Sequence, residues 1–175
     1  VEAGGERDVR DIRAEARTWL SEHWNPALTV RAWWALVAEA GWQFPSWPTG
    51  LGGRDLEAAA ERAVWEEMAV AGVLGPPFNL GTLTGAPTII AFGTPEQCRR
   101  LLPPLAFGLE AWCQLFSEPD AGSDLASVRT RAVRDGEVWR VEGQKIWSSG
   151  AAQADRGMLV ARTDPDVPKH KGLSF

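Results

Sequence analysis

Apolar residues recur at helical spacing through the N-terminal part of the chain, with charged residues between them. The first such stripe consists of Val9, Ile12, Ala16, Trp19 and Leu20. Because these positions fall on one face at about 3.6 residues per turn, they predict an amphipathic helix. Asn25-Pro26 then ends this helix.

The same spacing predicts two further helices. Thr29 can cap the second helix, and Gly41 suits the left-handed position after its end. Its apolar stripe is Trp33, Leu36, Val37 and Ala40. Residues 42–56 have no period and contain several Pro and Gly, which predicts a loop. The helical period returns over residues 57–71, before Gly75-Pro76-Pro77 breaks it.

Two shorter helices are predicted next. The apolar segment 79–92 predicts a buried helix, although it contains Gly and Pro. The side chain of Thr94 can accept a hydrogen bond from a free backbone N–H, and Pro95 suits the first helical position. The side chain of Gln97 can accept in return from the backbone N–H of Thr94. We expect the helix that begins there to end at Pro103-Pro104.

After Gly108 the pattern changes to short runs typical of β-strands. The expected strands are residues 112–117, 128–134, 137–141, 144–148 and 157–163, with another that begins at 173. Asp135-Gly136 separates two of them and predicts a two-residue hairpin turn. Pro119–Asp124 is expected to form a loop.

Helices thus fill about residues 1–110 and strands fill 111–175, which predicts an α+β chain with two domains. The last expected strand begins at Leu173-Ser174-Phe175, and the sequence ends inside it. A sheet that ends within a strand leaves unpaired backbone donors and acceptors at an edge, whereas domain boundaries usually fall in polar linkers. We therefore expect the sequence to be a fragment.

Composition and charge narrow the function classes. Hydrophobic residues make up 45% and charged residues 23%, as in soluble globular proteins. No window approaches the roughly 18 consecutive apolar residues of a membrane helix. The net charge of −5 argues against nucleic acid as a partner. The polar start is not a signal peptide, and a cytoplasmic location is expected.

Several kinds of site are not indicated by the sequence. The Cys and His residues have no metal-site spacing: Cys98, Cys113, His23 and His170. There is no GxGxxG after a strand, no phosphate loop with GK[ST] and no GxSxG elbow. Glu66-Glu67 lies within a helical pattern, and we interpret the pair as part of a solvated helix face rather than as a catalytic dyad.

Two motifs in the strand region carry the candidate chemistry. The first, WCQLFSEPDAGSD, passes from a strand into a loop with small residues, hydroxyls and acids. Such a strand end can offer backbone N–H and C=O groups to the polar edge of a planar ring, because small residues permit close approach. Composition alone leaves a well-capped structural turn as the alternative. The second motif, EGQKIWSSG, ends at Gly150.

Together the two motifs resemble the acyl-CoA dehydrogenase family. In that family a strand leads into [ST]EP-x-AGSD, and a hairpin then leads into GxKxWxTxG. The matching segments here are Ser117–Asp124 and Gly143–Gly150, and the spacing between them also fits. The resemblance covers essentially the whole chain. It implies an N-terminal all-α helical domain followed by an incomplete antiparallel β-barrel-like domain, without the family's C-terminal domain.

The resemblance implies FAD as cofactor and assigns residues to two ligands. The residues expected to contact the flavin are Gln114, Phe116, Ser117, Trp147, Ser148 and Ser149. Trp147 would pack against the flavin ring, and the two following hydroxyls would meet its reactive edge and tune its electronics. Ser123 would contact the acyl-CoA substrate, and no metal is implied.

Two positions depart from the family pattern. Ser149 stands where the family often has Thr, so the hydroxyl is kept and the methyl group is lost. Asp120 stands where the family usually has Gly, and Asp tolerates a positive φ less well than Gly. The carboxylate of Asp120 also adds negative charge near an anionic ligand, which is expected to weaken acyl-CoA binding.

The implied reaction oxidises an acyl thioester to the 2,3-enoyl thioester. A carboxylate removes the α-proton and the β-hydrogen leaves as hydride to the flavin, so the base must lie close and the thioester oxygen must be polarised. In most family members the base is a Glu in the C-terminal domain. We therefore assign no catalytic residue in this sequence and expect these 175 residues to be inactive alone.

Three functional hypotheses follow. The chain belongs to an active acyl-CoA dehydrogenase; or to a relative, namely an acyl-CoA oxidase, a flavin hydroxylase or a non-catalytic partner subunit; or it is an interaction domain without flavin. The resemblance also implies an electron-transfer flavoprotein as electron acceptor. It further implies a homo- or hetero-oligomer, either a dimer or a tetramer.

Overall fold

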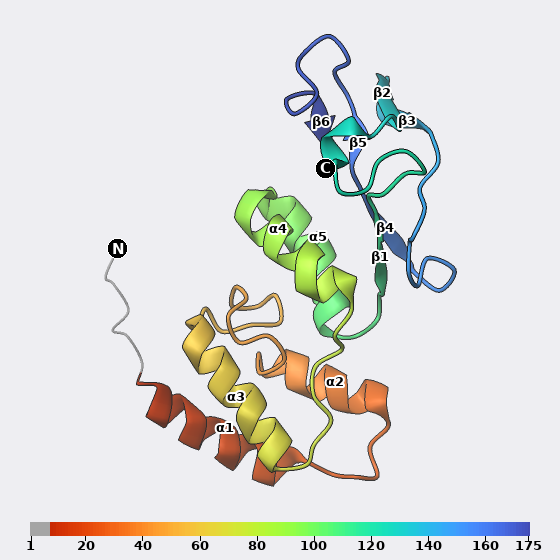
Figure 1. Ribbon diagram of the computed structural model, residues 1–175. Helices are drawn as coiled ribbons and strands as arrows, with labels where there is room; N and C mark the ends of the chain where they lie inside the picture. The colour runs from red at the N-terminus through yellow and green to blue at the C-terminus, as the bar shows by residue number, and fades with distance from the viewer. Residues whose placement is uncertain (1–7) are drawn as a thin grey trace. The chain divides into compact units, whose positions relative to one another are not determined.

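The computed structural model describes residues 8–175, which divide into two compact units (Figure 1). The first unit is helical and consists of the described residues up to 78 together with 82–109. The second unit carries the strands and consists of residues 79–81 and 110–175. The helices are α1 (Val9–His23), α2 (Val30–Glu39), α3 (Ala58–Val70), α4 (Ala86–Phe92) and α5 (Pro95–Ala106).

Side chains at the helix starts satisfy free backbone N–H groups, as the sequence predicts. Thr29 accepts from the N–H of Ala32 at 3.2 Å. Thr94 accepts from the N–H of Gln97 at 3.2 Å, and the Gln97 side chain accepts from the N–H of Thr94 at 2.7 Å. These two bonds complete a capping box and fix the start of α5. Gly41 follows α2 with a φ of 74°, as expected.

A hydrophobic core lies between α1, α2 and α3. Its buried members are Ile12, Ala16, Leu20, Trp33, Val37, Trp42, Ala60, Val64, Met68 and Val73. The indole N–H of Trp33 donates to the carbonyl of Leu74 at 2.7 Å. The ring therefore fills the core without leaving a buried donor unsatisfied.

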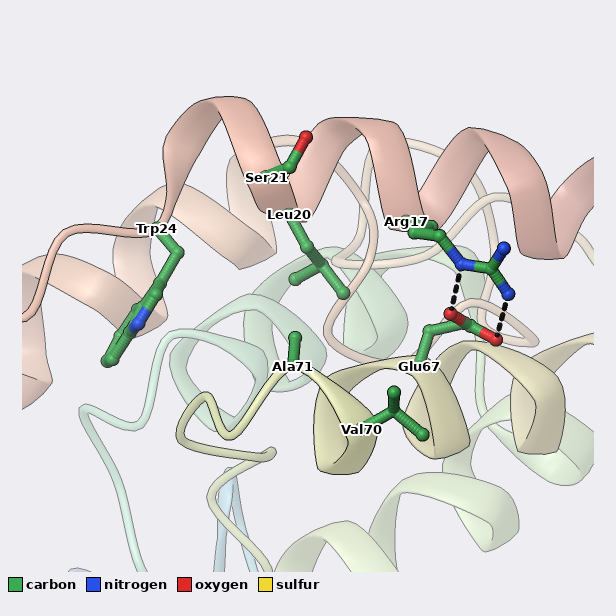
Figure 2. A pocket seen from close by; sticks show the side chains of 7 residues that line it. All are labelled: Arg17, Leu20, Ser21, Trp24, Glu67, Val70 and Ala71. Atoms are coloured by element: carbon green, nitrogen blue, oxygen red, sulfur yellow. Dashed lines mark hydrogen bonds and ion pairs between the residues drawn. The ribbon is translucent and has the colours of Figure 1, made fainter.

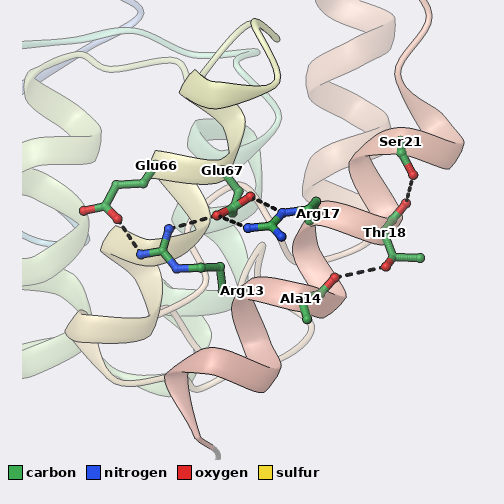
Figure 3. A network of polar contacts seen from close by, with 7 residues as sticks. All are labelled: Arg13, Ala14, Arg17, Thr18, Ser21, Glu66 and Glu67. Carbon is green, nitrogen blue, oxygen red and sulfur yellow. Dashed lines mark hydrogen bonds and ion pairs between the residues drawn. The ribbon is translucent and has the colours of Figure 1, made fainter.

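Glu67, which was expected on a solvated helix face, is buried instead. Its side chain is 3% exposed and accepts hydrogen bonds from Arg13 at 2.9 Å and from Arg17 at 2.8 and 3.1 Å (Figure 3). The hydrogen bonds from Arg17 lower the pKa of Glu67, burial raises it, and the bond from Arg13 lowers it further. The net result is a pKa of about 2. The prediction was wrong because both arginines lie on α1, far away in the sequence. Glu66 is exposed and pairs with Arg13.

The segment 79–92 is helical but only partly buried, which corrects the expectation of a buried helix. It begins with a π-helical turn, Gly81–Gly85, and continues as α4. Ala86 is buried, whereas the side chain of Phe92 is 87% exposed. The apolar composition of this segment thus predicted its helical state, but not which side chains face solvent.

The helix α5 passes through Pro103-Pro104 and ends at Ala106, two residues later than predicted. Each proline removes one backbone donor without removing its own carbonyl acceptor. The N–H of Phe107 donates to the carbonyl of Pro103 at 2.9 Å and completes the last turn. The helix therefore tolerates both prolines close to its end.

The strands form a two-stranded ladder and a four-stranded sheet. In the ladder, β1 (Trp112–Leu115) pairs in parallel with β4 (Arg156–Leu159). The sheet has the order β3-β2-β5-β6, and its strands are β2 (Arg131–Asp135), β3 (Val138–Glu142), β5 (Ala161–Arg162) and β6 (Leu173–Ser174). The pairs β2–β3 and β5–β6 are antiparallel, as expected, whereas β2–β5 is parallel. Long connections separate the members of each parallel pair, as such pairing requires.

Residues 144–148 form no strand, which corrects the prediction. The N–H of Ile146 makes one backbone bond to the carbonyl of Ser117 at 2.9 Å. Trp147 then takes a left-handed φ of 57°, which is incompatible with continued extended backbone. The conformation of this segment is thus set by a distant part of the chain rather than by its own β-propensity.

Two other strand boundaries shift. The strand predicted over 157–163 is divided at Val160 into β4 and β5. In the predicted hairpin, Asp135 pairs with Val138, so the two turn residues are Gly136 and Glu137, one position later than expected. Gly136 supplies the positive φ of 62° that such turns require at their first position.

The expected fold class is confirmed: helices precede a partial sheet, and no barrel closes within residues 8–175. Within the same residues, no helix has the length and apolar character needed to cross a membrane. The described part of the chain also contains no cluster of three His, Cys, Asp or Glu side chains that could hold a metal ion.

We predict that Glu67→Gln lowers the free energy of unfolding by about 2 kcal/mol at neutral pH, a range typical of hydrogen bonds to charged groups. The folded pKa of about 2 lies below the ordinary glutamate pKa of 4.5, so the carboxylate stabilises the fold above about pH 4.5. This contribution is lost as the pH falls from there towards 2. Urea unfolding across this range should therefore show the difference between wild type and Glu67→Gln shrinking. Glu66→Gln is the exposed control, and equal losses for both variants would contradict the buried role of Glu67.

Candidate functional site

The two sequence motifs contact each other within the β unit. The backbone N–H of Ile146 donates to the carbonyl of Ser117 at 2.9 Å. One residue earlier, Nζ of Lys145 donates to the carbonyl of Phe116, also at 2.9 Å. The segments that contain the expected flavin-contacting residues are therefore joined at consecutive positions.

A buried carboxylate strengthens this junction. The side chain of Glu118 is 7% exposed and that of Lys145 is 8% exposed, and Nζ lies 2.9 Å from Oε1. The backbone N–H groups of Arg129 and Thr130 also donate to the carboxylate, at 2.6 and 2.8 Å. Burial raises the pKa of Glu118, but the donors on Thr130, Arg129 and Lys145 outweigh burial and lower the pKa to about 2. Glu118 is thus ionised at neutral pH and held from several directions.

Trp147 combines two unfavourable features. Its side chain is 86% exposed, although its ring is large and apolar. Its backbone φ of 57° lies in the left-handed region, which bulky residues rarely adopt. Backbone strain of this kind persists only where the surrounding structure holds it, and it gathers at functional sites. The conformation of Trp147 therefore marks this segment as a candidate binding site.

Ser148 and Ser149 follow directly. Oγ of Ser148 is buried and has no hydrogen-bond partner among the described residues. A buried hydroxyl without a partner is unfavourable, and a ligand can supply the missing bond. Ser149 is exposed beside it. An exposed indole next to an unsatisfied hydroxyl suits the apolar face and polar edge of a flavin, so these residues fit the FAD expected from the sequence.

The first-motif candidates lie in β1 and directly after it. Gln114 is partly buried and pairs in register with Met158 of β4. The ring of Phe116 meets the ring of Phe175 edge-on, with 6.0 Å between centroids. The Phe116 side chain therefore serves packing, which leaves its backbone as the part that can face a ligand. Ser117 is partly buried and its carbonyl already accepts from the second motif.

The loop at the end of the first motif carries the expected substrate residue. Ser123 is exposed there. Asp120 has no positive φ, because the described non-glycine residues with that geometry are Asp55 and Trp147. Asp120 is thus unstrained where the family usually has Gly. Its carboxylate lies 3.8 Å from the guanidinium of Arg129, which offsets part of its negative charge.

Sequence reasoning did not identify Lys145 and Glu118 as a pair. Both lie inside the motifs, but they are 27 positions apart. A single sequence gives no sign that two charges at that separation meet in a buried contact. The only available signal was the presence of a Lys and a Glu at fixed places in two motifs that share one site.

A separate hollow lies in the helical unit between α1 and α3 (Figure 2). It has a volume of about 260 Å³ and is lined by Arg17, Leu20, Ser21, Trp24, Glu67, Val70 and Ala71. Its two charged groups bind each other, and the hydroxyl of Ser21 donates to the carbonyl of Thr18. Its polar side chains are therefore already engaged, and binding sites need polar groups that can orient a ligand.

Comparisons with known proteins agree with the motifs. The family model of the acyl-CoA dehydrogenase N-terminal domain matches residues 6–108, and that of the middle domain matches residues 113–175. Acyl-CoA dehydrogenase IpdE1 of Mycobacterium tuberculosis is 39% identical over 186 residues, which cover 97% of this chain and 48% of IpdE1. The chain spans about half, or less, of the length of the curated relatives it matches.

Solved structures give the same result. A chain of the ChsE4–ChsE5 complex from Mycobacterium tuberculosis matches with a TM-score of 0.68 and 35% identity, covering 99% of this chain and 46% of that one. A glutaryl-CoA dehydrogenase from Mycobacterium smegmatis, solved in complex with FADH2, matches with a TM-score of 0.53 and 28% identity. That match covers 90% of this chain and 43% of the other.

We predict that Gly143→Ala lowers the free energy of unfolding by about 2 kcal/mol, as overpacking does. A Cβ at Gly143 would clash with Oγ1 of Thr130 and lie 2.7 Å from its Cα, and the φ of 155° disfavours side chains. Because Thr130 donates to Glu118, the clash would also disturb the site.

Gly122→Ala is the matched control, because a Cβ there meets nothing within 4 Å. It is expected to change the free energy by no more than about 0.5 kcal/mol. Urea unfolding of both variants measures the difference. Equal stability of the two would show that the chain relaxes around Gly143.

Proposed function

Because the chain belongs to the acyl-CoA dehydrogenase family, we propose that its protein oxidises an acyl-CoA to the 2,3-enoyl-CoA with FAD as cofactor. The observation that carries the proposal is the exposed, left-handed Trp147 beside the unsatisfied hydroxyl of Ser148. A flavin would cover the indole and offer polar atoms to the hydroxyl. Both unfavourable features would then be relieved by one ligand.

Both motifs would contribute contacts to the flavin. The residues assigned to it are Gln114, Phe116, Ser117, Trp147, Ser148 and Ser149. Trp147 would cover the ring, and the two serine hydroxyls would donate to its polar edge. Phe116 would contribute through its backbone, because its side chain packs against Phe175. When bound, FAD supplies the acceptor for the hydride that leaves the substrate.

The substrate contact assigned to this chain is Ser123, which is exposed on the loop that ends the first motif. We assign no catalytic base. Glu118 is unsuited to the role, because it is buried in an ion pair and its pKa of about 2 makes it a weak base. Glu67 is unsuited for the same reasons. The base is expected in a part of the protein that this chain does not span.

An oligomer that passes electrons to an electron-transfer flavoprotein in the cytoplasm completes the proposal. The related ChsE4–ChsE5 structure is a complex of two named chains, which supports assembly with a second polypeptide. The same observation favours one alternative function, that of a non-catalytic partner subunit in such a complex. Flavin reduction by substrate separates the two functions.

We predict that the full-length protein binds FAD and that its visible absorbance bleaches when one acyl-CoA is added without oxygen. Hydride transfer from substrate removes the absorbance of oxidised flavin, so bleaching reports binding and chemistry together. The panel should contain fatty, branched and sterol-derived acyl-CoA thioesters. Bound FAD that stays oxidised with every thioester would favour the partner-subunit function, and a protein without flavin would contradict the proposal.

We predict that Trp147→Ala raises the dissociation constant of FAD by about tenfold, because losing an aromatic contact costs about 1.4 kcal/mol. Trp139→Ala is the control, since Trp139 is also exposed, at 57%, but lies on β3 outside both motifs. Titration of the flavin-free protein, followed by flavin fluorescence, measures both constants. Equal weakening by the two substitutions would argue against a specific contact at Trp147.

A further inference from the structure

Lys145 joins the two motifs through its side chain, and Ile146 joins them through its backbone N–H. Nζ donates to the carbonyl of Phe116 and to Oε1 of Glu118, each at 2.9 Å. The N–H of Ile146 donates to the carbonyl of Ser117 at 2.9 Å. Three bonds between residues 116–118 and 145–146 thus fix the position of the chain immediately before Trp147.

The carboxylate that receives Lys145 is itself immobilised. The backbone N–H groups of Arg129 and Thr130 hold Glu118 from the segment that leads into β2. Glu118 and Lys145 are both buried, so water cannot replace a broken bond without cost. A buried ion pair adds little net stability compared with an apolar pair of the same shape, because both charges lose their hydration. Its distinctive effect here is therefore on geometry.

The segment held by these three bonds leads directly into a strained residue. Trp147 takes its left-handed φ of 57° directly after the fixed positions, with its ring in solvent and the unsatisfied hydroxyl of Ser148 beside it. An unconstrained chain would leave this conformation, because the backbone strain and the exposed ring both oppose it. The restraint on residues 145–146 is what opposes that relaxation.

We propose that the buried Glu118–Lys145 pair is a positioning pair, which holds residues 147–149 in the conformation that receives the flavin. The proposal rests on the flavin-binding function above and extends it to two residues to which no contact with flavin or substrate is assigned. Preorganisation of this kind lowers the loss of chain freedom on binding. Removing one partner leaves the other charge buried without its counter-ion, so it destabilises the fold as well. The effect on flavin binding is therefore measured against a variant that is destabilised in a comparable way.

The test is Lys145→Met in the full-length protein, which keeps the length of the side chain and removes the charge. We expect the dissociation constant of FAD to rise by about tenfold or more, the factor typical when the outer support of a bound metal is removed. The absorption bands of the flavin that still binds should move towards those of free FAD. Glu118→Gln, which keeps the shape and an oxygen acceptor, should shift both readouts in the same direction.

Glu67→Gln is the matched control, because Glu67 is an equally buried, ion-paired carboxylate in the other unit. Each protein is titrated at the same interval below its own melting temperature, so that a general loss of stability cancels. Lys145→Met with the affinity and spectrum of the control would overturn the positioning role. If Lys145→Met does not fold, Glu118→Gln decides in the same way. A wild-type protein without flavin would instead overturn the proposed function, and the inference with it.

Discussion

The carboxylate of Glu118 is buried, and a buried negative charge is costly unless hydrogen-bond donors surround it. Here the donors come from several parts of the chain. The donors come from Lys145 in the second motif and from the backbone at Arg129 and Thr130, just before β2. One carboxylate thus ties together a strand end, the entry to the hairpin and the segment that carries Trp147. The arrangement of the candidate site follows from satisfying this charge.

The helical unit contains a comparable solution with a different outcome. Glu67 is buried and met by Arg13 and Arg17, and its pKa also falls to about 2. There the partners are partly exposed side chains on α1, and the result is a contact between two regular helices. In the β unit the partner lies in an irregular segment that has no ladder to support it. The same interaction therefore stabilises packing in one unit and shapes a loop in the other.

Local features of the chain could be predicted from the sequence, and features set by distant residues could not. The capping box at Thr94 was predictable because both of its partners lie within one helical turn. Residues 144–148 have the composition of a strand, but their contact with Ser117 and the φ of Trp147 override that propensity. The two sequence motifs were sufficient to identify the candidate site residues. The exposure of Trp147 and the unsatisfied hydroxyl of Ser148 depend on the fold and could only be seen in the structure.

The parallel pairing of β1 with β4 has a consequence for how the protein is made. β1 opens the first motif and β4 follows the second, so the ladder closes only after the whole stretch from Leu115 to Arg156 has been brought back on itself. Closing a loop of that length is entropically unfavourable before its contacts form, and non-local pairing slows folding. During synthesis on the ribosome, β1 could not pair until β4 had emerged. Almost all of the helical unit precedes β1 in the chain, so it would emerge first and would already be able to fold.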